Sequence, residues 1–131
     1  IAGALNEDKK SFSNTSKLMT NLMLQRGFDN ANTTLGVIIT NAKLNKAQCK
    51  KVAQVAHNGY ARAISPIHTT LDGDTIFSLA TGEVESSLDV IANLGSEVMQ
   101  EAIYKAIKSS DSINNLISFK DLKLSVVVIN L

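Results

Sequence analysis

Two apolar, β-branched runs separated by an amphipathic stretch limit most strongly what this chain can fold into. Residues 33–40, TTLGVIIT, and residues 75–81, TIFSLAT, have the composition of buried strands. Between them, residues 46–63 place apolar side chains on one helical face. Because strands that alternate with amphipathic helices form layers, the sequence predicts an α/β fold. Periodicity alone does not say whether the strands pair directly.

Local signals predict where these elements begin and end. Asn45 and Gln48 have the spacing of a capping box at the start of the helix at 46–63, which ends before Pro66. Gly36, inside the first strand, predicts that another group approaches the backbone closely. The other expected elements are a helix from Ser16 to Gly27, a helix from about Ser86 to Lys108, and an edge strand at 124–129.

The strand runs and the helix stripes together predict a hydrophobic core. Gly95, in the middle of the last helix, is expected where packing leaves no room for a side chain. The predicted core residues are Leu35, Val37, Ile39, Val52, Ala56, Ile76, Leu79, Ile91, Val98 and Ile103.

Composition excludes several classes of protein. Lys and Arg number 13 against 12 Asp and Glu, so a strongly basic nucleic-acid binder is not indicated. One cysteine excludes an internal disulfide framework and a thiolate metal cage. No apolar run approaches the roughly 18 residues of a membrane helix. The chain opens at Ile1 as if a strand were already under way, so we expect a piece of a longer or processed protein.

The acidic turn Asp72-Gly73-Asp74, at the mouth of the second strand, is the first candidate site. Two carboxylates that point to the same side can orient an amine or relay a proton, although such a sequence is also an ordinary turn. His57 and His68 lack a metal-ligand spacing, and we interpret His57 as a packing residue.

Thr33 is the second candidate and has two interpretations. It is either the first residue of a strand or a nucleophile that becomes N-terminal when the chain is cleaved after Asn32. In the second case its own α-amino group, with a pKa of about 7.7–8.0, acts as the base. The residue pattern alone does not choose between the two.

A resemblance to a known family favours the second interpretation. Residues 32–42, NTTLGVIITNA, resemble the start of the small subunit of self-cleaving aminopeptidases. This family includes L-aminopeptidase/D-esterases, β-peptidyl aminopeptidases and the nylon-oligomer hydrolase. Residues 53–64, 66–69 and 72–82 also follow the family pattern, and the similarity covers roughly residues 1–122.

The resemblance implies a fold and a set of site residues. It implies an αββα sandwich of the N-terminal-nucleophile type, with two antiparallel-running sheets between helix layers. Residues 1–32 would end the large (α) subunit segment and carry the cleavage loop, and residues 33–131 would form the small (β) subunit segment. Thr33 would be the nucleophile released by cleavage of the Asn32–Thr33 bond, with Asp72 and Asp74 as the acidic pair beside it. The tail at 123–131 matches nothing in the family.

The implied function is that of an amide or peptide hydrolase that needs no metal and no organic cofactor. Its expected partners are a short peptide or amide substrate, the missing upstream segment, which supplies a lysine and an asparagine, and further copies in a homo-oligomer. Neither nucleic acid nor a membrane is expected, and the expected location is the cytoplasm. The alternatives are an acyl transferase of the related arginine-biosynthesis type and an inactive structural fragment. We expect the isolated chain to be inactive.

Overall fold

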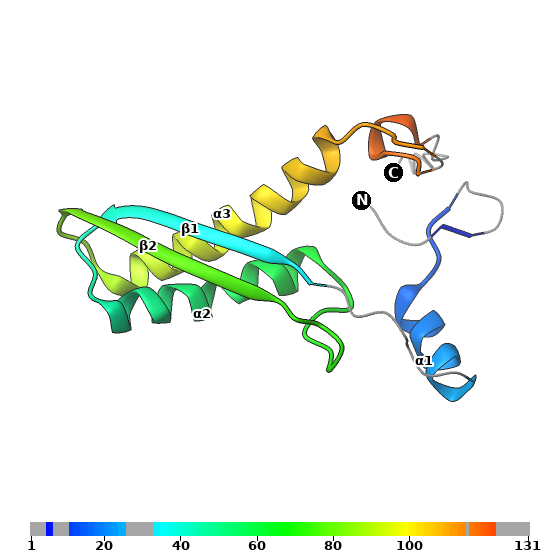
Figure 1. The fold of residues 1–131 in the computed structure, drawn as a ribbon, viewed down its shortest axis with the longest axis horizontal. Helices are drawn as coiled ribbons and strands as arrows, with labels where there is room; N and C mark the ends of the chain where they lie inside the picture. The colour runs from blue at the N-terminus through cyan, green and yellow to red at the C-terminus, as the bar shows by residue number, and fades with distance from the viewer. Residues whose placement is uncertain (1–4, 7–10, 26–32, 115, 123–131) are drawn as a thin grey trace, which may run out of the picture. The chain divides into compact units, whose positions relative to one another are not determined.

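The computed structural model describes residues 5–6, 11–25, 33–114 and 116–122 (Figure 1). The expected edge strand at 124–129 lies outside the described residues. Within them, the mixed α/β class and the order of the elements are confirmed. The elements are α1 (Thr15–Gln25), β1 (Leu35–Ala42), α2 (Lys46–Ala63), β2 (Thr75–Val84), α3 (Leu88–Ser109) and the short 3-10 helix η1 (Phe119–Asp121).

The chain divides into two compact units, residues 1–27 with 104–131 and residues 28–103. In the first unit, Leu5 and Phe12 form an isolated bridge. The Asp121 carboxylate accepts hydrogen bonds from the hydroxyls of Ser112 and Ser118, and these bonds lower the pKa of Asp121. No helix among the described residues is both long and apolar enough to cross a bilayer.

In the second unit, β1 and β2 pair directly and run parallel. Leu35 lies opposite Thr75 and Ile39 opposite Leu79. Parallel neighbours need a crossover connection, and α2 supplies it. The resemblance implied antiparallel-running sheets, but this pair is parallel because α2 carries the chain back to the edge where β1 began.

Capping fixes the start of α2 as predicted. The Asn45 side chain accepts a hydrogen bond from the Gln48 amide at 2.9 Å, and the Gln48 side chain accepts one from the Asn45 amide at 2.8 Å. This reciprocal pair confirms the capping box. At the start of α1, Asn14 rather than Ser16 accepts the hydrogen bond from the Lys17 amide, at 3.1 Å.

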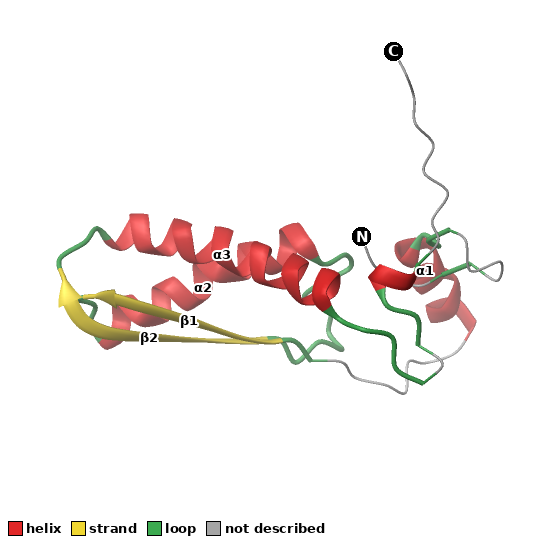
Figure 2. Cartoon of the chain, turned by 90° about the horizontal axis from the view of Figure 1, so that it is seen from above, coloured by secondary structure: helices red, strands yellow, loops and turns green. Residues whose placement is uncertain are grey.

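Helices α2 and α3 form one layer and the strand pair forms the other (Figure 2). The core lies between the layers and contains Ile38, Val52, Ala56, Tyr60, Ile76, Ala92 and Met99. Of the predicted core, Val52, Ala56 and Ile76 are confirmed as buried, and Ile91 and Ile103 are partly buried against them.

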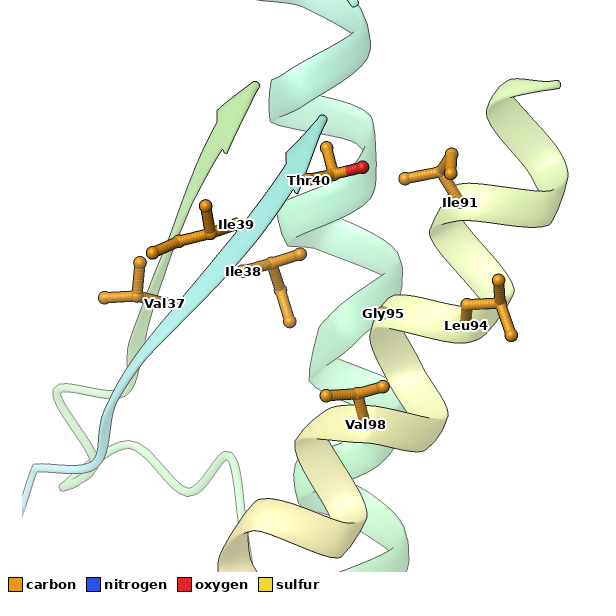
Figure 3. Close-up of a pocket in the computed structure, with 8 residues that line it drawn as sticks. All are labelled: Val37, Ile38, Ile39, Thr40, Ile91, Leu94, Gly95 and Val98. Atoms are coloured by element: carbon orange, nitrogen blue, oxygen red, sulfur yellow. The ribbon is translucent and has the colours of Figure 1, made fainter. Parts of the chain in front are cut away.

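The predicted register of the strands is wrong. Leu35, Val37, Ile39 and Leu79 all lie on the exposed face, with Ile39 72% exposed. Side chains of a strand alternate between its faces, so burying Ile38 sends Val37 and Ile39 to the other side (Figure 3). A run that is apolar on both faces carries no alternation from which the covered face can be read.

The buried stripe of α3 also differs from the prediction. Ala92, Gly95, Ser96 and Met99 are buried, whereas Val98 is 58% exposed. The reason is the close approach of α2 at Gly59, where an added Cβ would lie 2.4 Å from the Ser96 carbonyl oxygen. Small residues therefore face α2, and bulky ones turn outward.

Gly36 and Gly95 test the two expectations about close packing. An added Cβ on Gly36 would lie 2.6 Å from the Tyr60 hydroxyl, which confirms the predicted close approach. On Gly95 the nearest atom would be Cγ1 of Val52 at 3.5 Å, an ordinary contact. The expectation that Gly95 has no room is wrong, and Gly59 is the position where the helices meet most closely.

We expect Gly59→Ala and Gly95→Ala to have opposite effects on stability. Gly59→Ala forces the α2 and α3 backbones apart and should lower the free energy of unfolding by about 1–3 kcal/mol. Gly95→Ala has room for its methyl group and should raise that free energy by about 0.5–1 kcal/mol, because Ala favours a helix interior over Gly. Urea unfolding of the two variants measures both values. Equal losses would show that the helix contact is misplaced.

Candidate active site

The candidate site lies at the edge of the sheet where both strands begin. In a strand–helix–strand unit with parallel strands, the end of the helix returns to that edge. The last turns of α2, the loop at 64–74 and the start of β1 therefore meet there (Figure 1). This geometry gathers Thr33, His57, Tyr60, His68 and Asp74 from separate parts of the sequence.

The acidic turn lies directly against the segment that leads into β1. The Thr34 amide donates a hydrogen bond to Oδ1 of Asp74 at 2.9 Å, and the Thr34 carbonyl accepts one from the Thr75 amide at 3.0 Å. An added Cβ on Gly73 would lie 2.8 Å from Oγ1 of Thr33, so the hydroxyl sits over the backbone of the turn. Thr33 is exposed. A reachable hydroxyl is thus held next to a carboxylate 40 residues along from Thr34.

The Asp74 carboxylate is buried and only half satisfied. Its side chain is 5% exposed. Oδ1 bonds Thr34, whereas Oδ2 has no hydrogen-bond partner among the described residues. A buried carboxylate oxygen without a partner is costly, so this oxygen favours any donor that reaches it.

Asp72 has a different task in the structure. Its Oδ2 accepts a hydrogen bond from the Thr69 amide at 2.6 Å, and its own amide donates to the Thr69 carbonyl at 3.1 Å. The side chain thereby closes the loop that leads into the turn. Of the expected acidic pair, Asp74 bonds the Thr34 amide, and Asp72 supports the turn that carries it. Asn32, the other residue of the expected cleavage site, lies outside the described residues.

Tyr60 is a site residue that the sequence reasoning placed only in the core. It is fully buried, and its hydroxyl donates a hydrogen bond to the Thr34 carbonyl at 3.4 Å. Burial and, second, the negative charge of Asp74 raise the pKa of Tyr60. Tyr60 therefore stays protonated and holds the start of β1 as a donor. Its position near the end of the crossover helix is the signal that could have found it.

His57 packs as expected, but between two rings of the site. Its ring centroid lies 5.4 Å from that of Tyr60 and 5.1 Å from that of His68. Burial, followed by the charge of His68, lowers the pKa of His57, and Asp74 opposes the shift. No group of three or more His, Cys, Asp or Glu side chains in the described part of the chain is arranged to hold a metal ion.

The lowered pKa of His57 predicts a loss of stability in mild acid. Below its ordinary pKa of 6.5, the unfolded chain binds a proton at this residue more readily than the folded chain does. The contribution is therefore fully present above pH 6.5 and falls as the pH drops from 6.5 toward the folded-state pKa. Unfolding measured across this range should show a weaker pH dependence for His57→Phe, which keeps the ring contacts. An unchanged dependence would contradict the assignment.

The fold and the site define an α/β protein with an exposed hydroxyl and a buried carboxylate at the start of a parallel strand pair. The sequence model of peptidase family S58 matches residues 3–117. The chain belongs to this family, and the resemblance stated from the sequence is confirmed.

Curated relatives carry the names of hydrolases. An uncharacterized aminopeptidase of Mycobacterium leprae is 57% identical over 56 residues, which are 43% of this chain and 16% of the relative. A 6-aminohexanoate-oligomer endohydrolase of Kocuria sp. (strain KY2) is 33% identical over 90 residues, and the match covers 59% of this chain and 25% of the relative. The same name and identity belong to a protein of Paenarthrobacter ureafaciens. The chain therefore spans about a quarter or less of the length of these relatives.

Proposed function

We propose that the full-length protein is an amide or peptide hydrolase whose nucleophile is Thr33, made N-terminal by self-cleavage. The observation that supports this most directly is the hydrogen bond from the Thr34 amide to Asp74, with the Thr33 hydroxyl over Gly73. A threonine hydroxyl is a weak nucleophile and needs an adjacent base. Membership in family S58 and the hydrolase names of the relatives point to the same reaction class.

The first reaction of such a site is on its own chain. Thr33 Oγ1 attacks the Asn32 carbonyl carbon, the peptide nitrogen leaves as the Thr33 amine, and the acyl group is carried on Oγ1 as an ester. Water then cleaves the ester, which leaves a carboxylate on Asn32 and restores the Thr33 hydroxyl. The chain is thereby divided into segments 1–32 and 33–131.

The same groups then act on a substrate. The Thr33 amine takes the hydroxyl proton as Oγ1 attacks the substrate carbonyl, and later activates the water that releases the acyl group. This amine is one residue before the Thr34 amide that Asp74 already binds, and Oδ2 of Asp74 has room for a further donor. Asp74 would hold and polarise the amine, with Asp72 fixing the turn. The substrate class we propose is short peptides or amide oligomers.

The described unit leaves apolar surface that a further layer would cover. One face of the strand pair exposes Leu35, Val37, Ile39, Phe77 and Leu79. A groove of about 170 Å³ also opens between β1 and α3, and Figure 3 shows Ile38 and Val98 among its lining residues. Exposed apolar surface on this scale marks a contact site. We propose that the segment upstream in the full-length protein packs there and completes an αββα sandwich. The isolated chain of 131 residues should then not hydrolyse amides.

The intact mass of the purified full-length protein tests this function. Two chains that separate at the Asn32–Thr33 bond, together with release of product to water from a peptide or 6-aminohexanoate oligomer, are expected. Transfer of an acyl group to an amine acceptor in place of water would assign the acyl transferase instead. A single uncleaved chain without activity would overturn the proposal.

A further inference from the structure

The second oxygen of Asp74 has one polar neighbour whose role the mechanism above does not use. Nδ1 of His68 lies 3.6 Å from Oδ2 of Asp74, within the reach of an ion pair and somewhat longer than a hydrogen bond. Catalytic hydrogen bonds are often long in the absence of substrate and shorten when it binds. Oδ2 is the carboxylate oxygen that lacks a hydrogen-bond partner among the described residues.

The backbone of His68 is held in a conformation that aims its ring. Its φ is 58°, in the left-handed region that ordinary side chains avoid at a cost of about 1–2 kcal/mol. A strained residue of this kind persists where its surroundings fix it, and such residues gather at functional sites. The ring of His57, 5.1 Å away, supports the side of the His68 imidazole. The ring is 40% exposed, so substitutions there do not open the core.

We propose that His68 is a positioning residue for the hydrolase reaction: its Nδ1–H donates to Oδ2 of Asp74 and fixes the carboxylate that holds the Thr33 amine. This rests on the proposed function. Oδ1 is bound by the Thr34 amide, so two donors from opposite sides set the plane of the carboxylate. The remaining lone pairs of Oδ2 then point to one place, where the amine is received. A misplacement of about 1 Å at such a group costs on the order of 10²-fold in rate.

Two substitutions separate the donor from the backbone conformation. His68→Asn puts an amide nitrogen where Nδ1 stands and tolerates a positive φ, whereas His68→Gly tolerates that φ and removes the donor. In the full-length protein, His68→Asn should keep self-cleavage and kcat within about tenfold of the wild type. His68→Gly should slow both by on the order of 10²-fold, with little change in KM and in the temperature of unfolding. A normal rate for His68→Gly, or an equal loss in both variants, would overturn the proposal.

A measurement on the unmodified protein keeps the test independent of folding. Nitrogen-15 NMR of the labelled full-length protein should show the proton of the neutral His68 ring on Nδ1, and finding it on Nε2 would overturn the proposal. Thr33→Ala, measured in parallel, separates the two levels of the argument. Self-cleavage by Thr33→Ala defeats the proposed function itself. An inactive Thr33→Ala beside a fully active His68→Gly defeats the role of His68 alone.

Discussion

Thr33→Ala should abolish self-cleavage of the full-length protein and its amide hydrolysis together. The substitution removes the oxygen that attacks Asn32 and, later, the substrate. Loss of a hydroxyl nucleophile that works with a base typically costs about 10⁴- to 10⁶-fold in rate. The side chain is exposed and packs little, so the variant should fold as one uncleaved chain. Intact mass and a turnover assay on the same sample measure both effects.

Thr33→Ser is the matched control for this experiment. Serine keeps the hydroxyl and the α-amine and removes only a methyl group. It should therefore still cleave the chain and hydrolyse substrate, at a different rate. Efficient cleavage by Thr33→Ala, or none by Thr33→Ser, would mean that the nucleophile is another residue.

The sequence predicts the α/β order well because local signals are strong where these elements begin and end. The capping pair Asn45 and Gln48 and the apolar face with Val52 and Ala56 both appear as expected. The covered face of β1 could not be predicted in the same way. Residues 35–39 are apolar on both faces of the strand, and the tertiary contact of α2 with α3 decides which one is buried.

The candidate site shows the same division. Thr33 and Asp74 were chosen from residue type and from the resemblance, and the structure brings their segments together through the Thr34 amide. The parts played by Tyr60 and His68 depend on distance, because a buried hydroxyl at 3.4 Å and a ring with positive φ leave no mark in one-dimensional spacing. Burial of Asp74 is likewise a tertiary property, and it contradicts the expectation that a turn carboxylate packs little.

That burial makes Asp74→Asn a sharper experiment than truncation. Asp74→Ala would leave the Thr34 amide without an acceptor, at a cost of about 1–3 kcal/mol, and would mix folding with chemistry. Asparagine keeps an oxygen for Thr34 and removes the negative charge that polarises the Thr33 amine. We expect Asp74→Asn to fold normally and to lose on the order of 10²-fold in both self-cleavage and kcat.

Asp72→Asn separates the effect of this particular charge from that of any charge in the turn. Its side-chain oxygen can still accept from the Thr69 amide, so the loop should stay closed. Because Asp72 bonds its own loop while Asp74 bonds the Thr34 amide, the loss in Asp72→Asn should be the smaller of the two. Comparable losses would show that the two carboxylates act as one unit. Wild-type rates in Asp74→Asn would place the group that holds the amine elsewhere, in the segment upstream.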